Sequence, residues 1–194
     1  MNRLAKYTIT TILGLCSLIH ANDYFVEARA AYFYPTDGRF KKFYSGGAIW
    51  GAELDCQIWK QLYGWVGASY FDKSGSTSIH NKTEVRMVPI NLGLKGIWNS
   101  WRVWKPYLGA GASATYLQVH THSNYLIRSN SSWGFGGIFK AGLLITPTNS
   151  FLIDLYTDYS LTKVNLDRKG GKFVLIDDAD ISGFSFGGAL GYRF

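Results

Sequence analysis

Apolar and polar residues alternate along most of the chain from residue 24 onward, with the period of two that is typical of β-strands. From Tyr24 to Tyr34 every second residue is apolar or aromatic, while Glu27 and Arg29 lie on the opposite face. Seven further runs repeat this pattern, at 48–58, 64–72, 84–98, 108–116, 133–145, 151–160 and 184–194. No run has a helical period, so the chain is predicted to be all-β, with eight antiparallel strands.

The connections between these runs alternate in length. Short turns are expected near Lys60, near Ser100 and at 147–150, whereas long polar loops are expected at 35–46, 73–83, 120–132 and 161–180. Short turns at one end and long loops at the other are typical of bacterial outer-membrane barrels. An even number of strands then leaves both termini on the short-turn, periplasmic side.

A water-soluble sandwich or lipocalin-like barrel would show the same alternation, with its apolar face turned inward. The polar face of this chain favours the membrane arrangement instead, because it is rich in glycine and carries charges of both signs that can pair in a narrow interior. The predicted interior charges are Glu27, Arg29, Glu53, Asp55, Lys95, Lys140, Asp154, Asp158 and Arg193.

Aromatic residues gather at the predicted strand ends, as expected where amphipathic rings meet the two membrane interfaces. The periplasmic group is Trp59, Tyr63, Trp65, Trp98, Trp101, Trp104 and Tyr192. The outer group is Tyr34, Trp50, Tyr116, Trp133, Tyr159 and Phe184. Together these patterns predict an eight-stranded, antiparallel, up-and-down transmembrane β-barrel over residues 22–194.

Residues 1–21 have the pattern of a secretory signal peptide that is cleaved after Ala21. Arg3 and Lys6 precede an apolar stretch that is too short to span a membrane as a helix. Lipidation of Cys16 is the alternative, but the small residue usually required before such a cysteine is missing. Removal of this segment lowers the net charge from +7 to +5 and leaves Cys56 as the only cysteine, so no internal disulfide is expected.

Two stretches resemble known outer-membrane barrels. The last run ends on Phe194 with apolar residues at every second position before it, and it resembles the C-terminal signal read by the barrel-assembly machinery. The residues that carry this signal are Phe186, Leu190, Tyr192 and Phe194. The segment 106–112, Pro-Tyr-Leu-Gly-Ala-Gly-Ala, resembles a strand start common in small OmpA/OmpX-type barrels. The resemblance implies an outer-membrane barrel of a Gram-negative bacterium, and we expect no peptidoglycan-binding domain after it.

Catalysis has one candidate motif, His120, His122 and Ser123. Some barrels of this type are lipid A deacylases, which use a His and a Ser two residues apart together with an acid. Here His122 and Ser123 are adjacent, so a continuous strand would place them on opposite faces. We therefore expect no enzymatic activity, and lipid A modification is kept as an alternative.

No metal or cofactor is expected. His80 joins His120 and His122 only if two loops fold together, and Asp177, Asp178 and Asp180 lack the spacing of a complete Ca²⁺ loop. The basic residues of the first long loop, Arg39, Lys41 and Lys42, are expected to face the phosphates of lipopolysaccharide. Nucleic acid is inaccessible at that position.

An eight-stranded barrel has an interior just wide enough for side chains to fill. The sequence therefore predicts a monomeric outer-membrane protein with a filled interior and a structural or surface-interaction role, such as adhesion or serum resistance. Its expected partners are outer-membrane lipid and lipopolysaccharide, the barrel-assembly machinery, and a host or cell-surface ligand. A narrow pore for small solutes is the main alternative, and a lipid A-modifying enzyme is the second.

Overall fold

The computed structural model describes residues 23–38, 46–76, 82–99, 101–123, 126–165 and 178–194. The described residues form nine strands. These are β1 (Tyr24–Pro35), β2 (Gly47–Trp59), β3 (Leu62–Ser76), β4 (Lys82–Ile97), β5 (Trp104–Ser123), β6 (Leu126–Ile145), β7 (Phe151–Asn165), β8 (Asp178–Asp180) and β9 (Gly183–Arg193).

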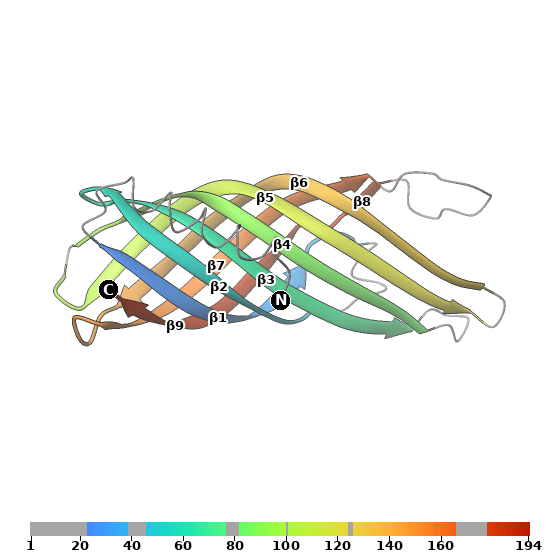
Figure 1. Cartoon of the computed structure of the whole chain (residues 1–194), viewed down its shortest axis with the longest axis horizontal. Helices are drawn as coiled ribbons and strands as arrows, with labels where there is room; N and C mark the ends of the chain where they lie inside the picture. Colours follow the sequence, from blue (N-terminus) through green and yellow to red (C-terminus); the bar gives the residue numbers. More distant parts are fainter. Residues whose placement is uncertain (1–22, 39–45, 77–81, 100, 124–125, 166–177) are drawn as a thin grey trace, which may run out of the picture.

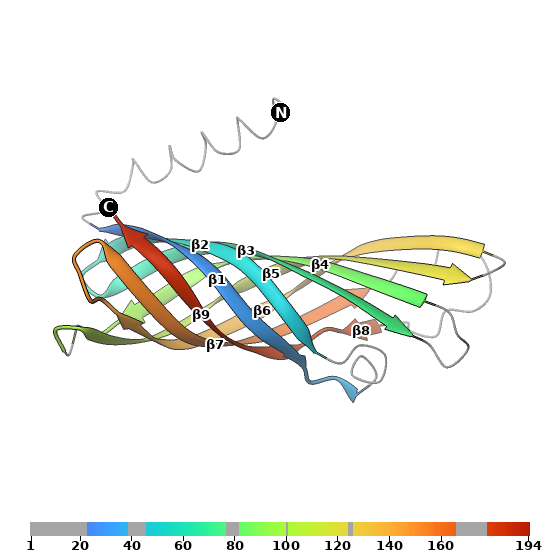
Figure 2. The same ribbon diagram turned by 90° about the horizontal axis from the view of Figure 1, so that it is seen from below.

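All neighbouring strands pair antiparallel, and the sheet closes on itself. Each strand from β1 to β7 pairs with the next one along the chain, and β9 pairs with both β7 and β1. The three-residue strand β8 is an addition that pairs with residues 163–165 of β7. Eight long strands thus form a closed up-and-down barrel, which confirms the predicted fold (Figures 1 and 2).

The barrel has two different ends. The turns after β2, β4 and β6 lie at one end, together with Asp23 and Phe194, and we call this the turn end (Figure 1). The turn after β2 is tight, and Lys60 adopts a positive φ of 45° there. The opposite end, where β1, β3, β5 and β7 finish, is called the loop end.

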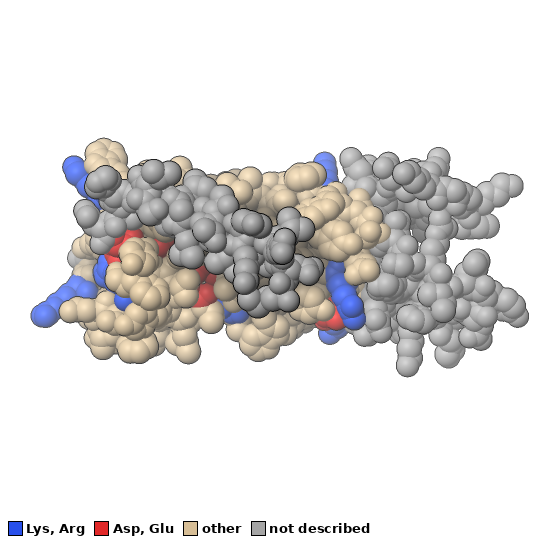
Figure 3. All heavy atoms as spheres, in the orientation of Figure 1, with Lys and Arg blue, Asp and Glu red and all other residues tan. Residues whose placement is uncertain are grey.

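The outer wall is formed by the apolar positions of each alternating run. In β1, exposed and buried residues alternate with a period of two over most of the strand. Large side chains on the outer wall include Trp50, Leu92, Phe135 and Leu190, which are 59–70% exposed. Among the atoms of Figure 3 that are not grey, most are tan, and scattered Lys, Arg, Asp and Glu side chains show between them. Within the described residues, no helix is long and apolar enough to cross a membrane.

Two aromatic residues predicted at the periplasmic interface point into the barrel instead. Tyr63 and Trp65 are 4% and 3% exposed. Both lie in β3 at the positions that alternate with the outward-facing Val66 and Tyr70. The alternation along β3 therefore determines that these two rings point inward. Their position near the end of a strand does not turn them toward the membrane interface. Trp59, Trp98, Trp101 and Trp104 do lie exposed at the turn end.

The loop between the fifth and sixth runs is much shorter than predicted. β5 continues to Ser123 and β6 begins at Leu126, where the sequence pattern indicated a loop at 120–132. Their backbones pair from Trp104 with Ile145 to Ser123 with Leu126. Likewise β3 and β4 extend to Ser76 and from Lys82, into the loop predicted at 73–83. Backbone pairing continues there because it does not need an apolar face.

Candidate functional site in the barrel interior

A layer of charged side chains crosses the middle of the barrel, and we call it the ionic layer. Its members come from five strands: Glu27, Arg29, Glu53, Asp55, Lys95, Lys140, Asp154 and Asp158. Seven of them are at most 9% exposed, and the Asp158 side chain is 12% exposed. The inward positions of the strands place these groups together, and the glycines between them leave the room that long side chains need.

Glu53 joins the basic members of the layer. Its carboxylate accepts hydrogen bonds from Arg29 Nη1 at 2.5 Å, from Lys95 Nζ at 2.9 Å and from Lys140 Nζ. Lys95 Nζ also forms an ion pair with Asp55 at 2.8 Å. Hydrogen bonds to charged groups are stronger than neutral ones, so Glu53 ties β1, β2, β4 and β6 together across the interior.

Aromatic rings support the same charges. The Tyr107 hydroxyl donates to Asp154 at 2.8 Å. The Arg29 guanidinium lies 3.7 Å from the centre of the Tyr156 ring, and Lys140 Nζ lies 4.1 Å from that of Trp65. A cation over a ring face is stabilised more strongly when it is removed from water.

Apolar side chains close the interior on both sides of the ionic layer. Toward the turn end the layer packs against Phe25, Tyr63, Ile97, Tyr107, Leu144 and Leu152, which we call the turn-end apolar layer. Toward the loop end lies a second group, Phe33, Phe71, Val85, Met87, Leu117 and Ile181, the loop-end apolar layer. Each of these side chains is at most 5% exposed.

A cavity of about 60 Å³ lies between the ionic layer and the loop-end apolar layer. Hydroxyl groups line much of its wall, from residues 69, 113, 115, 160, 162 and 185, and Arg29, Glu53 and Asp158 lie on the side of the ionic layer. A cavity of this size and polarity holds a few water molecules.

Arg193, predicted among the interior charges, lies apart from the ionic layer. It donates to both carboxylate oxygens of Asp23 at the turn end, where Asp23 also accepts from the Tyr63 hydroxyl at 2.8 Å. Burial by itself raises the pKa of Asp23, but the hydrogen bonds from Arg193 and Tyr63 outweigh it and hold that pKa below its usual value. These residues line a hollow of about 600 Å³ that also contains Arg102 and Lys105.

Other candidate residues are only partly described. The predicted assembly signal, Phe186, Leu190, Tyr192 and Phe194, lies on the outer wall of β9 and just after it, with 42–69% exposure. The backbones of His120, His122 and Ser123 lie in β5, and their side chains are outside the described part. Arg39, Lys41, Lys42, His80 and Asp177 fall outside the described residues, so the predictions made for them stay predictions.

The sequence pattern did not reveal the partners of the ionic layer. Tyr107, Tyr156 and Trp65 were not predicted to contact charges, although all three occupy inward positions that the alternation defines. Asp23 was also missed, because it precedes the first alternating run. A parity count extended by one residue at the strand ends places Asp23 and Tyr107 on the inner face, whereas Trp65 and Tyr156 already lie within the predicted runs.

Comparison with known proteins agrees with this architecture. No family model and no curated protein matches the chain. Solved structures do, among them the outer membrane protein OprG of Pseudomonas aeruginosa, with 17% identity, a TM-score of 0.64 and coverage of 90% of this chain and 96% of that one.

Two further structures are similar. Ail, the attachment invasion locus protein of Yersinia pestis, solved with the heparin analogue sucrose octasulfate, has 16% identity and a TM-score of 0.57 over 89% of this chain and 97% of that one. Outer Membrane Protein W of E. coli has 18% identity and a TM-score of 0.55, over 90% and 98%. At such identities the likeness concerns the fold. The chain has the fold of the small eight-stranded barrels that span the bacterial outer membrane.

Proposed function

We propose that this chain is a non-enzymatic outer-membrane protein that does not conduct solutes and that has a structural or surface-interaction role. The turn end, where Asp23 and Phe194 lie, faces the periplasm in this proposal, so that both ends of the mature chain are periplasmic. The loop end then faces the cell exterior. The observation that carries it is the filled interior, in which an ionic layer lies between two apolar layers.

The interior opposes the passage of a solute in two ways. An ion that enters from either end meets buried apolar side chains, where it loses its hydration. It then meets a layer whose charges already bind one another at 2.5–3.2 Å. The cavity of about 60 Å³ lies within this filling and is too small to form a channel along the barrel.

Liposome swelling tests the closed interior. Vesicles that contain the refolded protein should swell in small sugars and amino acids at the rate of empty vesicles, and planar bilayers should show no steady conductance. A known open porin reconstituted in parallel is the positive control. Steady conductance would reject the proposal and favour the narrow pore.

The surface-interaction role in this proposal is supported by the length of two strands, β5 and β6. β5 and β6 contain 20 residues each, about twice the length that crosses a membrane. In Figure 1 they run well beyond the loop-end limits of β1 and β2. Among the described residues, β6 pairs with β7 only from Gly134 onward, so residues 126–133 of β6 pair on one side only.

An unpaired strand edge is a surface to which an extended peptide can add. Ail, which shares the fold, was solved with a heparin analogue, so a fold of this kind also accommodates a sulfated ligand. For the present chain a host or cell-surface ligand at the projecting β5–β6 hairpin is therefore proposed.

Shortening the hairpin tests this role. A variant in which residues 120–129 are replaced by Asn-Gly should still fold, with the heat-dependent gel migration of a closed barrel, and should lose binding to host cells or immobilised heparin. The matched control replaces Thr148 and Asn149, in the turn after β6, by Asn-Gly. Equal binding by both variants would remove the case for the hairpin.

A further inference from the structure

The ionic layer contains more acid than base. It has five carboxyl groups, Glu27, Glu53, Asp55, Asp154 and Asp158, and three basic groups, Arg29, Lys95 and Lys140. Fully ionised, the layer has two negative charges in excess. An uncompensated charge in such a buried place costs several kcal/mol, so the interior requires positive charge that the described side chains do not supply.

The excess is concentrated around Glu27. This side chain is 0% exposed, and neither carboxylate oxygen has a hydrogen-bond partner among the described residues. Glu27 is also paired directly with Glu53 across β1 and β2, which places two like charges opposite each other. The unsatisfied group is therefore fixed by the strand register as well as by its side-chain conformation.

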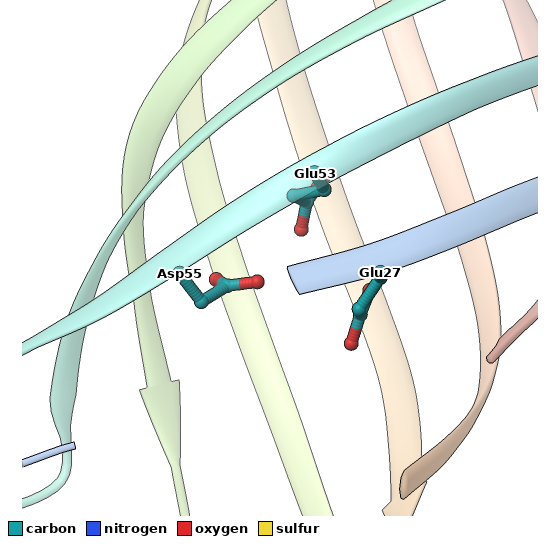
Figure 4. A group of neighbouring side chains, drawn as sticks. All are labelled: Glu27, Glu53 and Asp55. Atoms are coloured by element: carbon teal, nitrogen blue, oxygen red, sulfur yellow. The ribbon is translucent and has the colours of Figure 1, made fainter. Parts of the chain in front are cut away.

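Asp55 adds a second incompletely satisfied carboxylate at the same place. It is 0% exposed, its Oδ1 pairs with Lys95 Nζ at 2.8 Å, and its Oδ2 has no hydrogen-bond partner within the described part of the chain. Both oxygens of Glu53 are already used by basic groups. Figure 4 shows Glu27, Glu53 and Asp55 extending from neighbouring strands into the same part of the interior.

The spacing of these carboxylates suits one ion. One oxygen from each of Glu27, Glu53 and Asp55 lies within 4.8 Å of the others. Oxygens bound to the same ion lie at most twice the ion–oxygen distance apart, which is roughly 5 Å for Ca²⁺ and about 4 Å for Mg²⁺. A spacing of up to 4.8 Å lies within the limit for Ca²⁺, so the three carboxylates can reach one ion of that size. Mg²⁺ gives up its water ligands less readily, so a covered site favours the larger ion.

We propose that Glu27 and Asp55, with Glu53 beside them, bind one divalent cation of the size of Ca²⁺ inside the barrel. Its two positive charges balance the excess of the ionic layer. Lys95 lies next to the site and repels the ion, so the affinity is expected to be weak, of the order of millimolar as in extracellular Ca²⁺ modules. Because the apolar layers cover the site, the ion binds as the barrel folds.

Equilibrium unfolding tests this site. The chain is refolded into zwitterionic detergent, and its urea midpoint is measured at constant ionic strength with EDTA, CaCl₂ or MgCl₂ from 0.1 to about 50 mM. The midpoint should rise with CaCl₂ and should rise less with MgCl₂. Glu27→Gln keeps the side-chain shape and removes an unpaired charge, so it folds, and it should weaken the apparent Ca²⁺ affinity at least tenfold. Asp55→Asn should do the same.

Asp72→Asn is the matched control, because Asp72 lies on the outer face of the barrel and is 38% exposed. Its midpoint should respond to CaCl₂ as the wild type does. A wild-type midpoint that does not respond to CaCl₂, or a Glu27→Gln variant that responds equally, would overturn the site. Protons would then be the compensating charge.

Discussion

Glu53 is the residue on which the interior depends most, because three buried basic groups donate to it. Glu53→Gln keeps the shape of the side chain but leaves Arg29, Lys95 and Lys140 without its charge. Removing one partner from a buried ion network typically costs about 3–5 kcal/mol. We expect a loss of that size in the free energy of unfolding, measured by urea denaturation of the refolded protein in lipid.

The control for this prediction is the ion pair between Asp72 and Arg86, whose side chains are 38% and 46% exposed. Exposed pairs contribute about 0–1 kcal/mol. Asp72→Asn should therefore change stability by less than about 1 kcal/mol. Equal losses for the two variants would show that burial does not set the strength of the network.

Gly142 is required by the ring that lies over it. A Cβ at this position would lie 2.6 Å from atoms of the Tyr107 side chain, whose hydroxyl donates to Asp154. Gly142→Ala should displace the ring and cost about 1–3 kcal/mol. Gly137, in the same strand, has more space around it, because a Cβ there would lie 3.7 Å from its nearest neighbour, the carbonyl oxygen of Gly111. Gly137→Ala should leave the urea midpoint within experimental error, and equal effects would contradict this account.

At the residue scale the sequence predicts which charges face inward but does not predict their partners. Alternation alone places Glu53 and Lys140 on inner faces. Their contact joins two residues that are 87 positions apart in the chain, and it depends on the stagger of the strands around the barrel. Neither the stagger nor the rotamers are encoded in a period of two, so the role of Glu53 becomes visible only in the structure.

At the scale of elements, the first and last strands meet at a seam that Asp23 and Arg193 secure. Arg193 donates to Asp23 beside the pairing of β1 with β9. Asp23→Asn should cost on the order of 1 kcal/mol at pH 7, since the Arg193 side chain is 31% exposed.

The pH dependence of this variant follows from the lowered pKa of Asp23. The carboxylate contributes its stability above the ordinary Asp pKa of about 4. That contribution is lost as the pH falls through the lower pKa of the folded state. The difference in urea midpoint between wild type and Asp23→Asn should therefore shrink below about pH 4 and be constant from pH 6 to 8. A difference that grows on acidification would contradict the assignment.

The terminal ring of the chain gives a prediction for assembly in cells. Phe194 is 63% exposed, and its ring stacks on Tyr24 at 5.3 Å. Phe194→Ala should reduce the amount of heat-modifiable protein in outer-membrane fractions several-fold, because the proposed assembly signal is lost. Phe151→Ala is the control, since Phe151 is 61% exposed at the same end of the barrel. The same reduction for both variants would indicate a general loss of lipid contact.

Strand number and antiparallel order are predicted well from the alternation, but the loop-end limits of the strands are not. Lipid imposes the alternation only within the membrane. Beyond it β5 and β6 continue through Ser, Asn and His residues, because their backbones still pair with each other. A polar sequence in this region is therefore predicted to be a loop, although it forms a sheet.

At the scale of the whole molecule, a solute that crosses the barrel has to pass the three layers of the interior one after another, so any one of them is enough to block it. Replacing Phe33 and Phe71 by alanine opens the loop-end apolar layer, in which the two rings lie 5.6 Å apart. The ionic layer and the turn-end apolar layer remain, so bilayers that contain the double variant should show no steady conductance. Single-channel recording checks this. A double variant that conducts would show that the loop-end apolar layer alone is the barrier to solutes.

The long β5–β6 hairpin also determines how far the protein reaches. Twenty residues at about 3.4 Å each, tilted by about 40°, rise roughly 50 Å, and about half of that is needed for the apolar band of an outer-membrane barrel. With the proposed orientation, the described tip of the hairpin, where Ser123 pairs with Leu126, stands roughly 25 Å above the lipid. An approaching surface would therefore touch the tip before it comes near any other described part of the chain.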